Sequence, residues 1–198
     1  MAVRSELFRD SLCDPKYRQG KEGYCWPALV EALLVSRGIT NWKRDDIASS
    51  MGTSTAYGTD TDDVIAFLTK NEINSYPEDG ISTRRLLWLM KNLPVGTDII
   101  ACIWDKRVSP GYTRLTDPPE SHNVALLETP MTQRGRRVVF FDTSTYIGGV
   151  LDWSLERWKR FWFGGPESMT EPDKNGEPIP YVPGSILVVG ASKRLSLF

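Results

Sequence analysis

The chain has 198 residues, which is enough for one domain with a substantial core. Hydrophobic residues make up 40% and charged residues 25%, a composition that excludes a disordered or fibrous protein. The 24 basic and 25 acidic residues nearly cancel, so the composition favours neither nucleic acid nor an anionic membrane as the main partner.

The N-terminal segment has no apolar core of signal-peptide length, and no apolar run approaches the roughly 20 residues that span a bilayer. We therefore expect a cytoplasmic protein. Its three cysteines, Cys13, Cys25 and Cys102, are an odd number without a secretion signal, which argues against a disulfide framework. Neither a CxxC pair nor a Cys/His cluster is present, so we expect no metal site and no cofactor.

The first half of the chain is typical of helices. CWPALVEALLVSR (25–37) places its apolar residues on one helical face, carries its proline in the first turn, and is followed by Gly38 as a stop signal. Three more helices are expected over 42–51 ending at Gly52, 61–71 capped by Asp60 or Thr61, and 82–93 capped by Ser82 and ended by Pro94.

The second half is typical of strands, which we expect at 97–104, 122–129, 136–143 and 185–192, with a short helix over 152–162. The strands on either side of the turn TQRGRR should form an antiparallel hairpin. Two Pro- and Gly-containing segments, 105–121 and 166–184, are expected to be exposed loops. Whether they gate a groove or bind a partner is open.

Helices first and strands afterwards predict an α+β fold rather than alternating βαβ units. We expect a single domain over 1–198, with a helical part at about 15–93 and an antiparallel sheet part at about 97–192.

Cys25 is a candidate nucleophile. It falls at the expected N-terminus of the first helix, where unsatisfied backbone N–H groups and the helix dipole favour a negative charge. Such a position lowers the pKa of a thiol, and the thiolate is the reactive form. The alternative is that Cys25 is a small buried hydrophobic residue.

His122 is the only histidine, and it opens a strand next to a long loop, from where it could reach a cleft and pair with a thiolate. Asp142 ends the next strand. If residues whose numbers sum to 264 face each other in the hairpin, then His122 lies opposite Asp142, which would orient the imidazole. The alternatives are a structural histidine and an aspartate that caps a turn.

Acyl transfer also needs donors for a developing oxyanion. The backbone N–H of Cys25 is one candidate, and the side-chain amide of Gln19, six residues earlier, is another. A glutamine in a loop is also commonplace, so Gln19 could have no such role.

Three stretches, QGKEGYCWPALVEALL, SHNVALLE and VVFFDTS, resemble the papain-like cysteine peptidases. The most similar branch is that of the bacteriocin-processing, double-glycine-leader peptidases and their stand-alone relatives. The resemblance covers about residues 15–162 and extends to the closing strand.

This resemblance implies a papain-like fold with Cys25 as nucleophile, His122 as general base and acid, Asp142 as the orienting residue and Gln19 as oxyanion donor. The chain departs from the family pattern at Trp26, where glycine is usual. It also carries Ser121 before the histidine and Thr143 after the aspartate, where glycine and proline are usual. None of these departures removes a reacting atom. Taken together, the three departures indicate a distant member of the family.

The expected function is a thiol-dependent peptidase that cleaves a peptide or isopeptide bond of a peptide or protein substrate through a thioester. One alternative is a transglutaminase-like acyltransferase with the same triad, and another is a catalytically silent peptide-binding module. Trp26 and Trp104 are candidates for lining a substrate groove, with core packing as the alternative.

Overall fold

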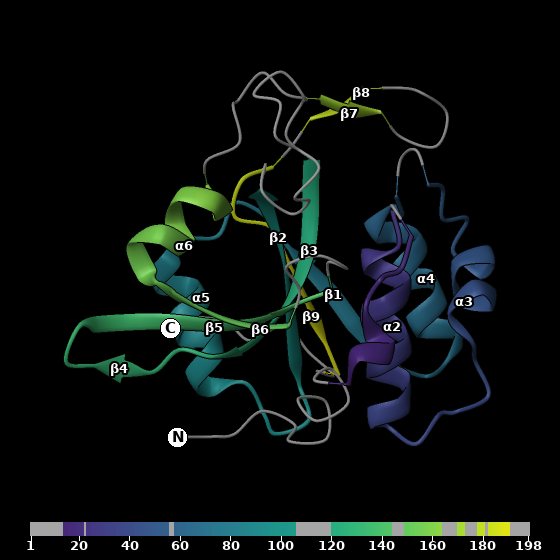
Figure 1. Cartoon of the computed structure of the whole chain (residues 1–198), viewed down its shortest axis with the longest axis horizontal. Helices are drawn as coiled ribbons and strands as arrows, with labels where there is room; N and C mark the ends of the chain where they lie inside the picture. The colour runs from purple at the N-terminus through teal and green to yellow at the C-terminus, as the bar shows by residue number, and fades with distance from the viewer. Residues whose placement is uncertain are drawn as a thin grey trace.

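A computed structural model describes residues 14–21, 23–55, 58–105, 120–143, 149–163, 170–172, 178–180 and 182–190. The fold is α+β, as the order of the elements predicted: a sheet of antiparallel strands has helices on both of its sides (Figure 1). Within the described ranges, no helix has the length and apolar character needed to cross a membrane.

The main sheet has the strand order β1–β9–β2–β3–β5–β4, with β6 also paired to β5. A separate pair, β7 and β8, lies within the 166–184 segment that we expected to be a loop. The strands are β1 Ser75–Glu78, β2 Asp98–Asp105, β3 Glu120–Glu128, β4 Met131–Thr132, β5 Gly135–Asp142, β6 Gly149–Ser154, β7 Thr170–Pro172, β8 Pro178–Pro180 and β9 Ile186–Val189.

The expected helices are all present, with their ends within two residues of prediction except for the start of α6, which lies three residues later. They are α2 Cys25–Ser36, α3 Arg44–Ser50, α4 Thr61–Lys70, α5 Thr83–Asn92 and α6 Leu155–Trp162, with a 3₁₀ turn η1 at Pro15–Tyr17. Ser82 caps α5 as predicted, since its hydroxyl accepts a hydrogen bond from the backbone N–H of Arg85 at 3.2 Å.

Alternate residues of the strands serve two cores, one on each face of the sheet. On β5, Val139 and Phe141 pack with α2 and α4, whereas Val138 and Phe140 pack with α5 and α6. Both faces are therefore buried, which is why these strands show continuous apolar runs in the sequence rather than alternation with polar residues.

Besides the short β4, β7 and β8, the sequence pattern missed β1 and β6. β1 contains Pro77 and lies at the edge of the sheet, where a missing backbone N–H is tolerated. β6 covers part of the segment 152–162 that we predicted to be helical. The helix starts only at Leu155, because the Ser154 hydroxyl caps it by accepting from the N–H of Arg157.

The expected division at about 93–97 does not coincide with the layers of the fold. β1, from the first part, completes the sheet, and α5 lies on the opposite face from α2 and α4 (Figure 1). Of the expected loop 105–121, residues 106–119 lie outside the described ranges, while its two ends extend β2 and β3.

The register of the β3–β5 hairpin differs from prediction. Val124, not His122, faces Asp142, so the paired numbers sum to 266 rather than 264. The turn is centred on Gln133 and Arg134, as the pairing of Thr132 with Gly135 shows, and a bulge follows between Leu126 and Glu128. The expected register placed this turn too early and included no bulge.

Candidate active site

His122 and Asp142 are bonded to each other inside the protein. His122 Nε2 lies 2.7 Å from Asp142 Oδ1, and both side chains are buried, 7% and 4% exposed. The register places the two residues as diagonal neighbours on β3 and β5, and a shift of two residues keeps both side chains on the same face of the sheet. The predicted proximity is therefore present, although the predicted pairing is wrong.

Cys25 is the first residue of α2, as the sequence predicted, and it is 8% exposed. The thiol of Cys25 and the imidazole of His122 interact electrostatically: the imidazole lowers the pKa of the thiol, and the thiol raises the pKa of the imidazole. Because Nε2 of that ring is bonded to Asp142, Nδ1 is the ring nitrogen that remains to interact with the thiol. The three residues thus form a chain in the order Cys25, His122 and Asp142.

The end of β5 explains how a helix from the other layer reaches these strand residues. In the described structure the last β3–β5 pair is Val124 with Asp142, whereas β3 stays paired with β2 as far as Glu120. His122 and Asn123 therefore extend past the paired end of β5. The N-terminus of α2, which packs on β3, meets them there.

The electrostatics of this group favour an ion pair. Burial opposes ionisation of Cys25, but hydrogen bonds from His122 and Asn123, together with the charge of His122, hold the pKa of the thiol below its ordinary value. Burial likewise opposes protonation of His122, but its hydrogen bonds and charge interactions with Asp142 and Cys25 raise the pKa of the imidazole to about 10. Thiolate and imidazolium thus stabilise each other.

Gln19 lies beside the residue that follows Asp142. Its backbone N–H donates to the Thr143 carbonyl at 2.8 Å, and the Thr143 hydroxyl donates to Gln19 Oε1 at 3.4 Å. These two bonds join the segment before α2 to the end of β5. The Thr143 hydroxyl binds the carbonyl oxygen of the Gln19 amide, so the NH₂ group of that amide points away from Thr143.

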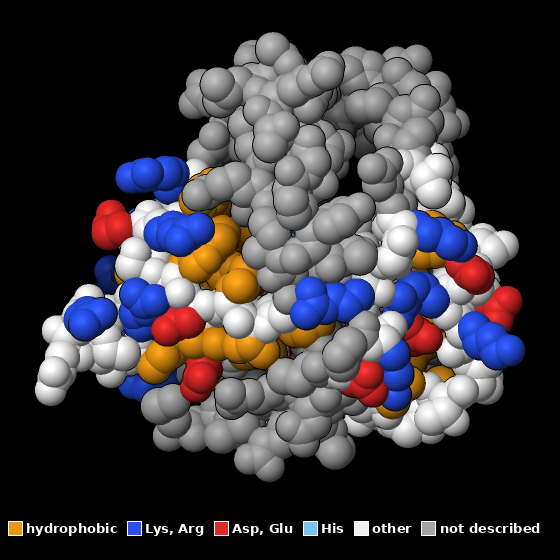
Figure 2. Space-filling model, viewed as in Figure 1, with side chains coloured by type: hydrophobic (Ala, Val, Ile, Leu, Met, Phe, Trp, Pro, Cys, Tyr) orange, Lys and Arg blue, Asp and Glu red, His pale blue; other side chains and the backbone are white. Residues whose placement is uncertain are grey.

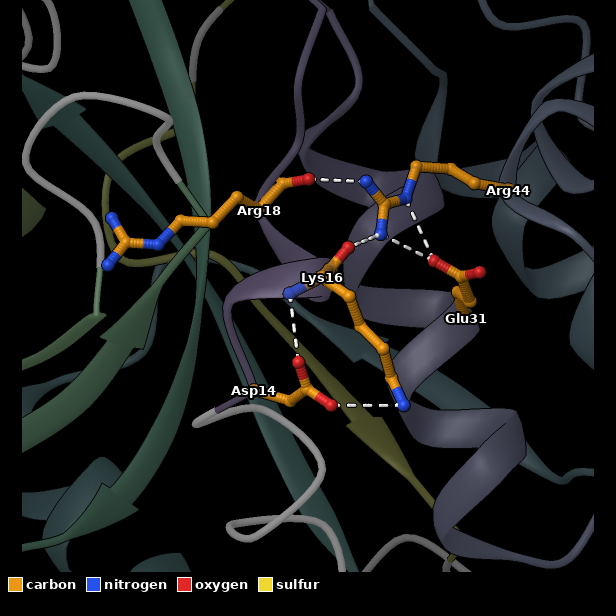
Figure 3. Close-up of polar contacts among 5 residues, drawn as sticks. All are labelled: Asp14, Lys16, Arg18, Glu31 and Arg44. Atoms are coloured by element: carbon orange, nitrogen blue, oxygen red, sulfur yellow. Dashed lines mark hydrogen bonds and ion pairs between the residues drawn. The ribbon is translucent and has the colours of Figure 1, made fainter.

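Arg44 of α3 fixes the segment that leads to Gln19 (Figure 3). Its guanidinium donates to the backbone carbonyls of Lys16 and Arg18, and it forms an ion pair with Glu31 of α2 at 2.6 Å. The side chain of Arg18 extends the other way, toward the sheet (Figure 3), with Nη2 next to Gly149, the residue that pairs with Asp142. The guanidinium of Arg44 thus fixes the backbone at Lys16 and Arg18, in the segment that precedes Cys25.

Trp26 does not support the expected groove. Its side chain is 3% exposed and packs in the core between α2 and the sheet with Leu29, Leu33 and Phe141. A ring buried there offers no surface to a substrate, so Trp26 is a core residue. Trp104 pairs with Ser121 across β2 and β3, but its side chain lies outside the described part of the structure.

Asn123 is the contact that sequence reasoning missed. Its side-chain Nδ2 donates a hydrogen bond to Cys25 Sγ at 3.7 Å. The signal was a polar residue between His122 and the apolar run VALL, in a strand that is otherwise buried. Within the described part of the chain, no cluster of three or more His, Cys, Asp or Glu side chains is arranged to hold a metal ion.

A comparison with protein-family models gave no match, and a search of curated proteins gave none either.

Proposed function

We propose that this protein is a papain-like, thiol-dependent hydrolase that cleaves a peptide or isopeptide bond. The observation that carries the proposal is the chain of contacts from Cys25 through His122 to Asp142, with the cysteine at a helix N-terminus. A helix that presents a cysteine to an antiparallel sheet bearing a histidine and an aspartate also supports a papain-like fold.

In the proposed reaction the Cys25 thiolate attacks the carbonyl carbon of the substrate, and the π electrons of the carbonyl move onto its oxygen. The backbone N–H of Cys25 and the amide of Gln19 are the proposed donors to this oxyanion. The oxyanion then collapses, the C–N bond breaks, and the imidazolium of His122 gives its proton to the departing amine. A thioester on Cys25 remains.

Water completes the cycle. His122, now neutral, removes a proton from a water molecule as the water oxygen attacks the thioester carbonyl. Collapse of the second tetrahedral intermediate breaks the C–S bond, releases the carboxylic acid and restores the thiolate–imidazolium pair. Throughout these steps Asp142 holds Nε2 of the ring, so that Nδ1 faces the sulfur.

The proposal is tested by the pH dependence of iodoacetamide alkylation, followed by mass spectrometry. Cys13, Cys25 and Cys102 fall on separate tryptic peptides, so each thiol is measured in the same sample. We expect Cys25 to react well below the ordinary thiol pKa of about 8.5, and to lose this advantage in His122→Ala. Equal behaviour of Cys25 and the other two cysteines would refute the proposal.

If Cys25 proves to be activated, the protein is then incubated with a library of fluorogenic peptides, with and without an excess of a primary amine. We expect a carboxylic acid product and a thioester on Cys25 that water removes. A product found only with the amine would replace the hydrolase with the acyltransferase. A peptide that binds without turnover would favour the silent binding module.

A further inference from the structure

The side-chain amide of Asn123 donates a hydrogen bond to the sulfur of Cys25. Its Nδ2 lies 3.7 Å from Sγ. Asn123 is only 9% exposed, so this amide faces the thiol inside the protein rather than water.

The arrangement of β3 explains how two consecutive residues reach one sulfur. His122 and Asn123 are neighbours on a strand, so their side chains leave it on opposite faces. The N-terminus of α2 meets β3 beyond Val124, the last described β3–β5 pair, and there Cys25 interacts with both residues.

The chemistry of the amide suits a charged sulfur better than a neutral one. A hydrogen bond is markedly stronger when its acceptor is ionised, and the amide brings no charge of its own. The titratable groups that act on Cys25 are His122 on β3 and, behind it, Asp142 on β5, and the first turn of α2 contains no acidic residue. Asn123 is therefore a neutral hydrogen-bond donor to the sulfur, whereas His122 and Asp142 act through their charges.

We propose that Asn123 is a catalytic residue of the proposed reaction, whose side-chain amide keeps the Cys25 sulfur in its thiolate form by donating a hydrogen bond to it. This inference rests on the proposed function, because it gives the thiolate its role as nucleophile. It adds a donor at the sulfur to the ion pair with His122, and it is distinct from the oxyanion donors Cys25 N–H and Gln19.

The test is the alkylation rate of Cys25 by iodoacetamide from pH 5 to 11 in wild type, Asn123→Leu and Asn123→Asp. Leucine keeps the approximate size of the side chain and removes the donor. Aspartate keeps its shape and places an anion against the sulfur. Asn71→Leu is the control, since Asn71 is a half-buried asparagine with an Nδ2 hydrogen bond to Phe67 O at 2.9 Å, but it is the C-cap of α4, away from the site.

For Asn123→Leu we expect the thiolate-to-thiol ratio at a fixed pH to fall about tenfold, which is a rise of about one unit in the pKa of Cys25. A thiolate of higher pKa is also the better nucleophile, with a Brønsted slope of about 0.4–0.5. The profiles of variant and wild type should therefore cross. The variant should react about three- to fourfold more slowly at acid pH and about threefold faster where both thiols are fully ionised.

Asn123→Asp should show a larger rise in the thiol pKa than Asn123→Leu, while Asn71→Leu should lower stability with the wild-type profile unchanged. A folded Asn123→Leu with the wild-type thiol pKa would overturn the inference. If the leucine variant does not fold, an Asn123→Asp profile that coincides with wild type would do the same.

The same data separate the two proposals. An activated Cys25 that depends on His122 but not on Asn123 leaves the proposed function standing and refutes this inference alone. A wild-type Cys25 that titrates like an ordinary thiol refutes both.

Discussion

His122 and Asp142 are bonded at 2.7 Å although they do not face each other across their strands. Asp142 pairs with Val124, and the imidazole reaches it diagonally. A histidine ring spans the distance to a diagonal neighbour, which a shorter side chain would not. The contact therefore depends on a long side chain at position 122 and on β5 ending at position 142.

Replacing Asp142 by asparagine should abolish the proposed activity without unfolding the protein. The amide keeps the shape but not the charge that raises the pKa of His122, so the imidazolium and its paired thiolate are both disfavoured. We expect kcat/KM on a cleaved peptide to fall by about 10²–10⁴-fold, the range of general acid–base catalysis. Asp152→Asn, on the neighbouring strand β6 and ion-paired to Arg137, is the control and should retain full activity.

Activity should depend on pH through the same pair. The acidic limb should follow ionisation of Cys25 and lie below the ordinary thiol pKa of about 8.5. The alkaline limb should follow loss of the His122 proton at a pKa of about 10. The measurement is kcat/KM from pH 4 to 11, and an acidic limb at the ordinary thiol value would contradict the ion pair.

Part of the folding stability should also be lost at high pH, because it depends on the same protonated imidazole. The pKa of His122 is raised from 6.5 to about 10 in the folded protein, so its contribution is fully present below about pH 6.5 and is lost as the pH rises through about 10. We expect the difference in unfolding free energy between a Cys25→Ser protein and the same protein with His122→Gln to shrink over this window. Asp142 still raises the pKa of His122 in that background. Urea unfolding at pH 6, 8 and 10 measures it, and a difference that grows with pH would reverse the sign.

Gly23, two residues before Cys25, should not tolerate a side chain. A Cβ there would lie 2.3 Å from the backbone oxygen of Ser54, and its φ is +72°. Gly38 has a similar φ, +77°, with nothing within 4 Å, so Gly38→Ala isolates the backbone cost of about 1–2 kcal/mol. We expect Gly23→Ala to cost more than this control in urea unfolding and to slow alkylation of Cys25, because the clash displaces the chain at the nucleophile. Equal losses in the two variants would contradict the close packing.

Removing the guanidinium of Arg44 should release the segment before α2. Arg44→Ala loses the ion pair to Glu31 and the bonds to the Lys16 and Arg18 carbonyls, and hydrogen bonds that involve a charged group are each worth about 1.5–3 kcal/mol. We expect a loss of stability of this order and a lower kcat, with the pKa of Cys25 unchanged. Lys21→Ala, which removes the exposed Lys21–Asp45 pair, should change neither.

The described part of the surface carries charges of both signs. On the face shown in Figure 2, Lys and Arg side chains are interspersed with Asp and Glu. This matches the nearly balanced charge of the sequence, 24 basic against 25 acidic residues. Association steered by a single-sign field is therefore not expected on that face.

The sequence by itself predicted the elements whose signals are local. Helical periodicity with caps and stop signals located α2, α3, α4 and α5, and apolar runs located β2, β3, β5 and β9. It also singled out Cys25, His122 and Asp142, because a helix N-terminus and the ends of apolar runs can be recognised from neighbouring residues, although β3 begins two residues before His122.

Only the tertiary structure decided what depends on distant parts of the chain. β1 and β6 exist because partner strands offer them hydrogen bonds, and the hairpin register follows from a turn and a bulge whose positions no periodicity marks. Trp26 is buried because the sheet covers that side of α2. Asn123 contacts Cys25, 98 positions away in the chain, because the N-terminus of α2 packs against β3 beyond Val124, the last described pair with β5. Contacts of this kind arise from packing between layers, which local propensity does not encode.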